Sequence, residues 1–151
     1  MIASDGRAAA RDAADGIGRP RIVIVDDDRD ITLGLKLGLE RKGFEVDLYN
    51  DPLDALAAME PDRWDLAILD VKMPNMTGFE LYRRLKSVDD GIAICFLTAF
   101  DIYKAEFSRL FPDIDAKAFF VKPIGIAELA ARLDQFLLER ASASGVQAGR
   151  L

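Results

Sequence analysis

The sequence predicts an α/β fold, a doubly wound parallel sheet with helices on both faces. Short apolar runs of strand length alternate along the chain with longer segments that carry helix signals. Three of these runs, residues 22–25, 66–69 and 92–97, are apolar throughout, which is typical of strands covered on both faces. A chain of 151 residues with 50% hydrophobic composition can form one domain with a sizeable core.

Turn and capping signals set the bounds of the individual elements. The expected strands are residues 21–25, 44–49, 66–69, 92–98 and 119–121. The expected helices are residues 30–42, 51–60, 79–86, 101–111 and 126–140. The first helix is ambiguous because its leucines alternate as in a strand, but Gly43 suits a C-terminal cap. Asp51 and Pro52 suit an N-cap followed by proline in the first turn, and Pro112 should end the fourth helix.

The flanking segments and the composition narrow the class of protein. Residues 21–140 form the expected domain, residues 1–20 an expected disordered tail, and residues 141–151 an expected frayed tail. No run reaches the roughly 18 apolar residues of a membrane helix, and the net charge of −6 argues against a broad nucleic-acid surface. Cys95, the single cysteine, lies in an apolar run, as expected of a buried thiol in a reducing, cytoplasmic compartment. Without any histidine the chain cannot carry a phosphohistidine or a histidine-based catalytic pair.

Four of the expected strands end at residues that can handle a phosphoryl group. These residues are Asp26 with Asp27, Asp70, Thr98 and Lys122. Ligands of an open parallel sheet bind beyond the carboxyl ends of its strands, so these side chains should share one pocket. Three carboxylates this close repel one another unless a cation neutralises them, and oxygen-only ligands suit Mg²⁺. Asp70 is the best nucleophile because it stands alone at its strand end.

Some of these residues, considered one at a time, also have a purely structural interpretation. Residues 26–28 alone would suggest an N-cap cluster, and Lys122 alone a solvated charge. Their coincidence at four strand ends favours the pocket. The bond before Pro123 is open to the cis form, which would aim Lys122 inward, although most such bonds are trans.

The segments 22–28, 66–78, 97–99 and 118–123 together resemble the response-regulator receiver domain of two-component signalling. The most specific part is the loop that follows Asp70, with Met73, Pro74 and Gly78. The resemblance covers about residues 21–140 in the family's order of elements. It implies a flavodoxin-like (βα)5 sheet with strand order 2-1-3-4-5.

The resemblance also implies the chemistry of the pocket. Asp70 would accept a phosphoryl group from a histidine kinase or a histidine phosphotransfer protein. Asp70, Asp27 and the backbone carbonyl of Lys72 would bind Mg²⁺. Asp26 would hold a metal-bound water, and Lys122 would contact the phosphate.

A switch follows from the same resemblance, with Thr98 as its hydroxyl and Phe119 as the aromatic partner. A phosphoryl group on Asp70 offers oxygens that can draw the Thr98 hydroxyl inward. The space that Thr98 leaves can be filled by the Phe119 ring. Phosphorylation would then change the surface of the last two helices and the fifth strand.

The departures from the family's pattern lie on this same surface. Residues 112–117 replace the small Gly/Ala-rich turn that is common before the fifth strand. The preceding helix carries an aromatic stripe of Phe100, Tyr103, Phe107 and Phe111. The simpler explanation of the stripe is that its rings pack on the sheet, but at least one ring could be exposed and contact a partner. Because the departures lie on the surface that usually forms the dimer or contacts the output protein, the sequence does not decide which output protein binds or whether a homodimer forms.

Two other functions compete with the switch. A haloacid-dehalogenase-like Mg²⁺-dependent phosphatase would use Asp26 and Asp28, which have that family's spacing, but it leaves Asp70 and its loop unexplained. An unphosphorylated scaffold would not need a complete pocket. We therefore expect a phospho-accepting protein that is not an enzyme, does not bind DNA directly and signals through protein contacts.

Overall fold

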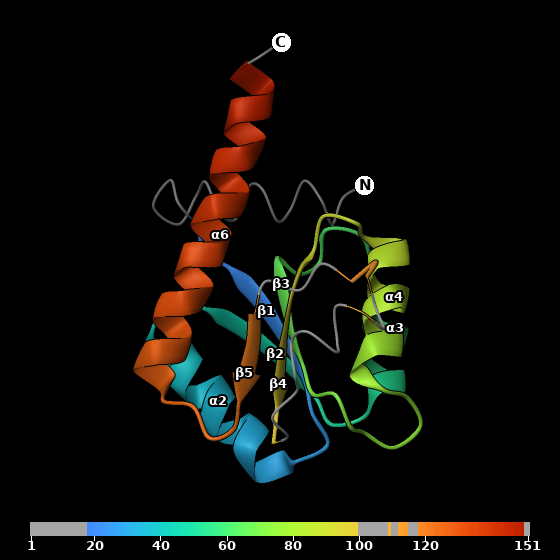
Figure 1. Ribbon diagram of the computed structural model, residues 1–151. Helices are drawn as coiled ribbons and strands as arrows, with labels where there is room; N and C mark the ends of the chain where they lie inside the picture. The colour runs from blue at the N-terminus through green and yellow to red at the C-terminus, as the bar shows by residue number, and fades with distance from the viewer. Residues whose placement is uncertain (1–17, 100–108, 110–111, 115–117, 150–151) are drawn as a thin grey trace.

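The protein folds into one parallel sheet with helices on both faces (Figure 1). The structure, a computed structural model, describes residues 18–99, 109, 112–114 and 118–149. The strands are β1 (Arg21–Val25), β2 (Glu45–Tyr49), β3 (Leu66–Leu69), β4 (Ala93–Thr98) and β5 (Ala118–Val121). The helices are α2 (Arg29–Arg41), α3 (Pro52–Ala58), α4 (Gly78–Val88) and α6 (Ile126–Gly149). The strand order is β2-β1-β3-β4-β5, which confirms the predicted fold class and strand order.

Two hydrophobic cores lie on opposite faces of the sheet. Helices α2 and α6 cover one face, and α3 and α4 cover the other (Figure 1). Alternate residues of each strand point to opposite faces, so Ile22 and Ile24 join the α2–α6 core and Val23 and Val25 join the other. The central strands β1, β3 and β4 are therefore buried on both sides, as their unbroken apolar runs indicated.

Helix α2 resolves the ambiguity of the first helical segment. Its N-cap is Asp28, whose carboxylate accepts a hydrogen bond from the backbone N–H of Ile31 (3.1 Å). Leu35 and Leu39 are buried at helical spacing, whereas Leu33 and Leu37 are exposed. The strand-like alternation thus comes from apolar residues on two sides of a helix, only one of which faces the core.

The chain ends differ from the expected tails in two respects. The last helix was expected to end near residue 140, but α6 continues to Gly149 and projects past the sheet (Figure 1). Its last turns contain alanine and no proline, so nothing in the sequence stops the helix at Arg140. At the other end, Pro20 was assigned to the tail, but its carbonyl accepts a hydrogen bond from Glu45 at the start of β2 (2.9 Å). Residues 1–17, and the predicted aromatic helix except Arg109, lie outside the described residues.

No helix among the described residues has the length and hydrophobicity needed to cross a bilayer.

Candidate functional site

Strand register brings the predicted site residues to one edge of the sheet. Val25 at the end of β1 lies beside Tyr49 of β2 on one side and Leu69 of β3 on the other. The next residue of each strand is polar, namely Asp26, Asn50 and Asp70. Further along the sheet, Thr98 at the end of β4 is aligned with Val121 of β5, which is followed by Lys122. All four predicted strand ends therefore meet.

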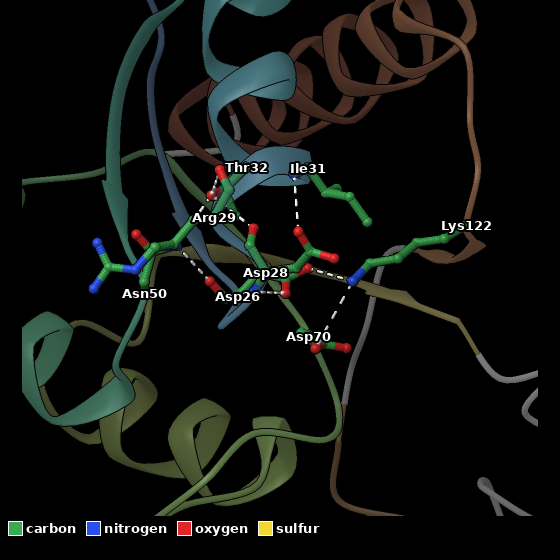
Figure 2. A network of polar contacts seen from close by, with 8 residues as sticks. All are labelled: Asp26, Asp28, Arg29, Ile31, Thr32, Asn50, Asp70 and Lys122. Carbon is green, nitrogen blue, oxygen red and sulfur yellow. Dashed lines mark hydrogen bonds and ion pairs between the residues drawn. The ribbon is translucent and has the colours of Figure 1, made fainter.

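Asp26 is held from several directions although it is only 2% exposed. Its Oδ1 accepts a hydrogen bond from the backbone N–H of Asp28 (2.9 Å), and its Oδ2 forms an ion pair with the Lys122 ammonium (2.5 Å). Within the described part of the chain no hydrogen bond of acceptable geometry reaches this Oδ2, so the ion pair is its main stabilising contact. Lys122 lies farther from Asp70 (3.8 Å) (Figure 2). The lysine thus contacts both carboxylates, with Asp26 as the closer partner rather than Asp70.

Asp70 is poorly placed to carry a negative charge unless something neutralises it. Burial raises the pKa of Asp70 from 3.8 to about 7, and the charge of Asp26 adds to this effect. The positive charge of Lys122 and a hydrogen bond from the backbone of Val71 act in the opposite direction. The local field therefore favours any cation or any proton that binds next to Asp70.

The three acids meet the first requirement of a magnesium site. One carboxylate oxygen from each of Asp26, Asp27 and Asp70 lies within 4.8 Å of the others. All three donors are oxygens, Asp27 is exposed and leaves room for waters, and Asp26 Oδ2 lacks a hydrogen bond among the described residues. Hard oxygen ligands with retained waters are what Mg²⁺ prefers. The three carboxylates therefore fit this ion. The backbone carbonyl of the exposed Lys72, which is close to Asp70 in the chain, stays a predicted ligand.

The loop after Asp70 needs a glycine at its end. Gly78 donates a hydrogen bond from its backbone N–H to the carbonyl of Val71 (2.9 Å). A Cβ at this position would overlap the backbone carbonyl of Asp70, so any larger residue would displace the acidic strand end. Met73 packs against the adjacent core, and Pro74 accepts a hydrogen bond from the N–H of Met76 (2.9 Å) within the turn. The loop signature thus has a structural reason.

Thr98 and Phe119, the predicted switch pair, lie on the neighbouring strands β4 and β5. Thr98 is 1% exposed at the end of β4, and its backbone carbonyl accepts a hydrogen bond from the N–H of Lys122 (2.8 Å). The half-buried Phe119 ring stacks on Phe96, with centroids 5.1 Å apart and planes at 16°. The aromatic side chain therefore packs against the α3–α4 core and remains partly exposed.

An apolar pocket adjoins the acidic cluster on the side of α2. The bond between Lys122 and Pro123 is cis, the form that the sequence left open. The pocket has a volume of about 500 Å³, and Lys122 and Asp30 contribute the charged groups of its lining. Its other walls include Ile31, Gly34, Leu35, Pro123, Ile124 and Ile126. A Cβ at Gly34 would meet no atom within 4 Å, so this glycine leaves the pocket open.

Two residues of the site were missed by sequence reasoning. Asn50 and the fully buried Thr32 form hydrogen bonds behind the acidic segment (Figure 2). The signal was available for Asn50, because it follows the second strand just as Asp26 and Asp70 follow theirs. Nothing in the sequence marked Thr32, which sits inside a helix.

Comparison with protein families assigns most of the chain to one known family. Residues 22–134 match the model of the response regulator receiver domain. The chain is 38% identical over 117 residues to the response regulator MprA of Mycobacterium leprae, covering 78% of this chain and 50% of that protein. It is 34% identical over 127 residues to the transcriptional regulatory protein PrrA of Mycobacterium tuberculosis, covering 84% and 54%. The chain therefore spans about half the length of these relatives.

Solved structures agree with the family assignment. A CheY-like response regulator receiver domain protein from Methanospirillum hungatei superposes with a TM-score of 0.75 at 29% identity, covering 83% of this chain and 99% of that one. The non-phosphorylated HemR receiver domain from Leptospira biflexa superposes with a TM-score of 0.70 at 27% identity, covering 79% and 94%.

Proposed function

Because the chain belongs to the response-regulator receiver family of two-component signalling, we propose that it accepts a phosphoryl group from a phosphohistidine donor onto Asp70. The observation that carries the proposal is the meeting of three carboxylates within 4.8 Å, with one lysine in contact with two of them. Receiver domains interact with histidine kinases in general, and a cytoplasmic kinase domain or phosphotransfer protein is the donor we expect here.

The transfer needs an ionised Asp70 and a neutralised phosphoryl group. A carboxylate oxygen of Asp70 attacks phosphorus, the new P–O bond forms as the P–N bond to the donor's histidine breaks, and the imidazole leaves with that electron pair. Asp27, Asp70 and the carbonyl of Lys72 would hold Mg²⁺, with Asp26 acting through water. When bound, the ion would supply positive charge for the oxygens of the transferred group.

Lys122 is the protein's own positive charge for the phosphoryl group. In the structure its ammonium pairs with Asp26 Oδ2 at 2.5 Å. A phosphoryl oxygen on Asp70 would compete for the same ammonium, because charge-assisted hydrogen bonds to phosphate are strong. Asp26 would then be left with the backbone N–H of Asp28 and the metal-bound water.

The donor would dock beside α2. The pocket of about 500 Å³ lies next to Lys122, and α2 exposes Ile31, Leu33 and Leu37. Apolar surface beside a phosphorylation site suits a partner that must bring a histidine within reach of Asp70. The output would leave from the other side of the site, where Thr98 and Phe119 respond to the phosphoryl group and change β5 and its surroundings.

A phosphatase that uses Asp26 and Asp28 is less well supported. Asp28 caps α2 through the N–H of Ile31, and Asp26 is buried against Lys122. Asp26 is therefore not an exposed nucleophile, and the exposed Asp28 carboxylate is engaged as a helix cap. We propose a protein that is modified once per activation and reset by slow hydrolysis, without turnover of an external substrate.

Acetyl phosphate with Mg²⁺ tests the proposed function directly. Intact mass should rise by one phosphoryl group, and peptide mapping after reduction of the acyl phosphate should place it on Asp70. Asp70→Asn should remain unmodified under the same conditions. Modification of Asp26 or Asp28, or steady hydrolysis of a generic phosphate ester, would support the phosphatase instead.

A further inference from the structure

The amide group of Asn50 connects two segments that carry the acidic cluster (Figure 2). Its Nδ2 donates one hydrogen bond to the backbone carbonyl of Asp26 (2.8 Å) and one to the hydroxyl of Thr32 (3.0 Å). The Thr32 hydroxyl has a single proton, and it donates to the carbonyl of Asp28 at 2.9 Å, with Arg29 at 3.1 Å as the alternative acceptor. The Asp26 carbonyl and the Thr32 hydroxyl oxygen therefore both act as acceptors toward Asn50. The Nδ2 group of Asn50, rather than its Oδ1, must point toward them.

We propose that Asn50 and Thr32, named here the Asn50–Thr32 latch, position Asp27 for Mg²⁺ binding; this inference rests on the proposed function. Asn50 is a positioning residue in this scheme, since it acts through the backbone of the acidic segment. It would touch neither the metal nor the phosphoryl group.

The peptide bond between Asp26 and Asp27 explains why the latch matters. The carbonyl that Asn50 holds belongs to this planar peptide, so fixing its oxygen also fixes the direction in which the chain enters Asp27. The carboxylates of Asp26 and Asp28 have contacts of their own, with Lys122 and with the N–H of Ile31. The exposed side chain of Asp27 depends more heavily on its backbone.

The latch also links three elements of the fold. Asn50 directly follows β2, the Asp26 carbonyl directly follows β1, and Thr32 lies in the first turn of α2. Thr32 is fully buried, so its hydroxyl is shielded from water and its hydrogen bonds are hard to replace. Loss of the Asn50 amide would leave an acceptor without its donor on each side.

Mg²⁺ affinity, measured by titration calorimetry on folded protein at 0.15 M salt, tests the latch. Partners that orient metal ligands change affinity by about 10–100-fold when removed; for this latch we expect Asn50→Ala to weaken Mg²⁺ binding about tenfold. The rate of phosphorylation by acetyl phosphate at saturating Mg²⁺ should stay close to that of the wild type. Thr32→Val, which removes only the second anchor, should weaken binding less, and adding it to Asn50→Ala should change little further.

Asp51→Ala is the matched control, because it alters the next residue of the same loop. Asp51 caps α3 by accepting a hydrogen bond from the N–H of Leu53 (2.9 Å), so its loss should lower stability without releasing the Asp26 carbonyl. If Asn50→Ala is too unstable to study, Asn50→Ser keeps one donor and should show an intermediate affinity.

Three results would contradict the latch. Equal Mg²⁺ affinity in Asn50→Ala and wild type would overturn it while leaving the proposed function intact. An equal loss in Asn50→Ala and Asp51→Ala would also overturn it, because general loosening of the loop would then be sufficient. A wild type that binds no Mg²⁺ would overturn the proposed function and this inference together.

Discussion

Asp70→Asn should stabilise the metal-free protein at neutral pH, and this gain should disappear in acid. Burial, with a further contribution from Asp26, raises the pKa of Asp70 to about 7. A carboxyl group with a higher pKa in the folded state binds more protons when folded, so stability falls as the pH rises. The loss begins near the unfolded value of 3.8 and is complete above about 7. Asparagine has nearly the same shape and no charge to bury.

The pKa difference sets the size of the effect. One pH unit corresponds to about 1.36 kcal/mol, so the rise from 3.8 to about 7 gives an upper bound of about 4 kcal/mol. Relaxation around an ionised carboxylate reduces this bound, and we expect about 1–3 kcal/mol in the free energy of unfolding at pH 8. Lys122 keeps its closer partner Asp26 in the variant, so no buried ammonium is left without a counter-charge.

Urea unfolding in EDTA at pH 4, 6 and 8 measures the effect as a difference between variant and wild type. That difference should grow from pH 4 to pH 8, since other groups titrate alike in both proteins. Asp27→Asn is the control, because Asp27 is exposed and its charge affects the pKa of Asp70 less than any of the other contributing groups; it should change stability much less. A difference that does not vary with pH, or a less stable Asp70→Asn at pH 8, would refute the reasoning. With Mg²⁺ present, the wild type should regain stability and the difference should shrink.

Three further predictions concern the pocket, the helix beside it and the switch. Gly34→Leu should fill the pocket and slow transfer from a histidine phosphotransfer protein about tenfold, equivalent to about 1.4 kcal/mol of docking energy, while leaving the reaction with acetyl phosphate unchanged; equal slowing with both donors would contradict the docking surface. Gly38→Ala should lower stability in urea because its Cβ would meet the Ile126 side chain at 2.7 Å, whereas Gly34→Ala, which points into open space, should raise it by about 0.5–1 kcal/mol. Thr98→Ala should still accept phosphate, but phosphorylation-dependent hydrogen-exchange changes around Phe119 and β5 should shrink; the full wild-type change in this variant would rule out Thr98 as the switch.

The strand-end residues were predictable because parallel strands share a direction. A residue that follows an apolar run needs no tertiary knowledge to be placed at the carboxyl edge, and this rule located Asp26, Asp70, Thr98 and Lys122. The same rule applied to Asn50 would have placed this residue at the site, although not its partner Thr32. It was missed because Asn50 precedes Asp51 and Pro52, which suggest a helix start, and the local capping signal hid the tertiary one.

Other features depend on tertiary contacts that cannot be ranked from the sequence. The ammonium of Lys122 lies nearer to Asp26 than to Asp70, and this preference is set by the direction in which the lysine side chain crosses the site. Thr32 gains its role only when α2 packs beside β2, since its hydroxyl is otherwise one more polar atom in a helix. The length of α6 was underestimated because small polar residues suggested a frayed end although they are compatible with a helix.

The ionised Asp70 carboxylate is destabilised by its burial and by the nearby charge of Asp26. The same two causes make the carboxylate sensitive to a cation that binds beside it. A carboxylate with an ordinary pKa would gain little from a nearby cation, because water would already stabilise its charge. The Asp70 site, raised to about 7 by burial and by Asp26, gains free energy from any positive group that reaches it. Lys122 supplies only part of that charge, since its ammonium lies closer to Asp26. The acidic cluster is therefore incompletely neutralised in this structure. Under the proposed function, binding of Mg²⁺ and transfer of a phosphoryl group would both supply the missing stabilisation, and the proposed switch would pass the change on to Thr98 and Phe119.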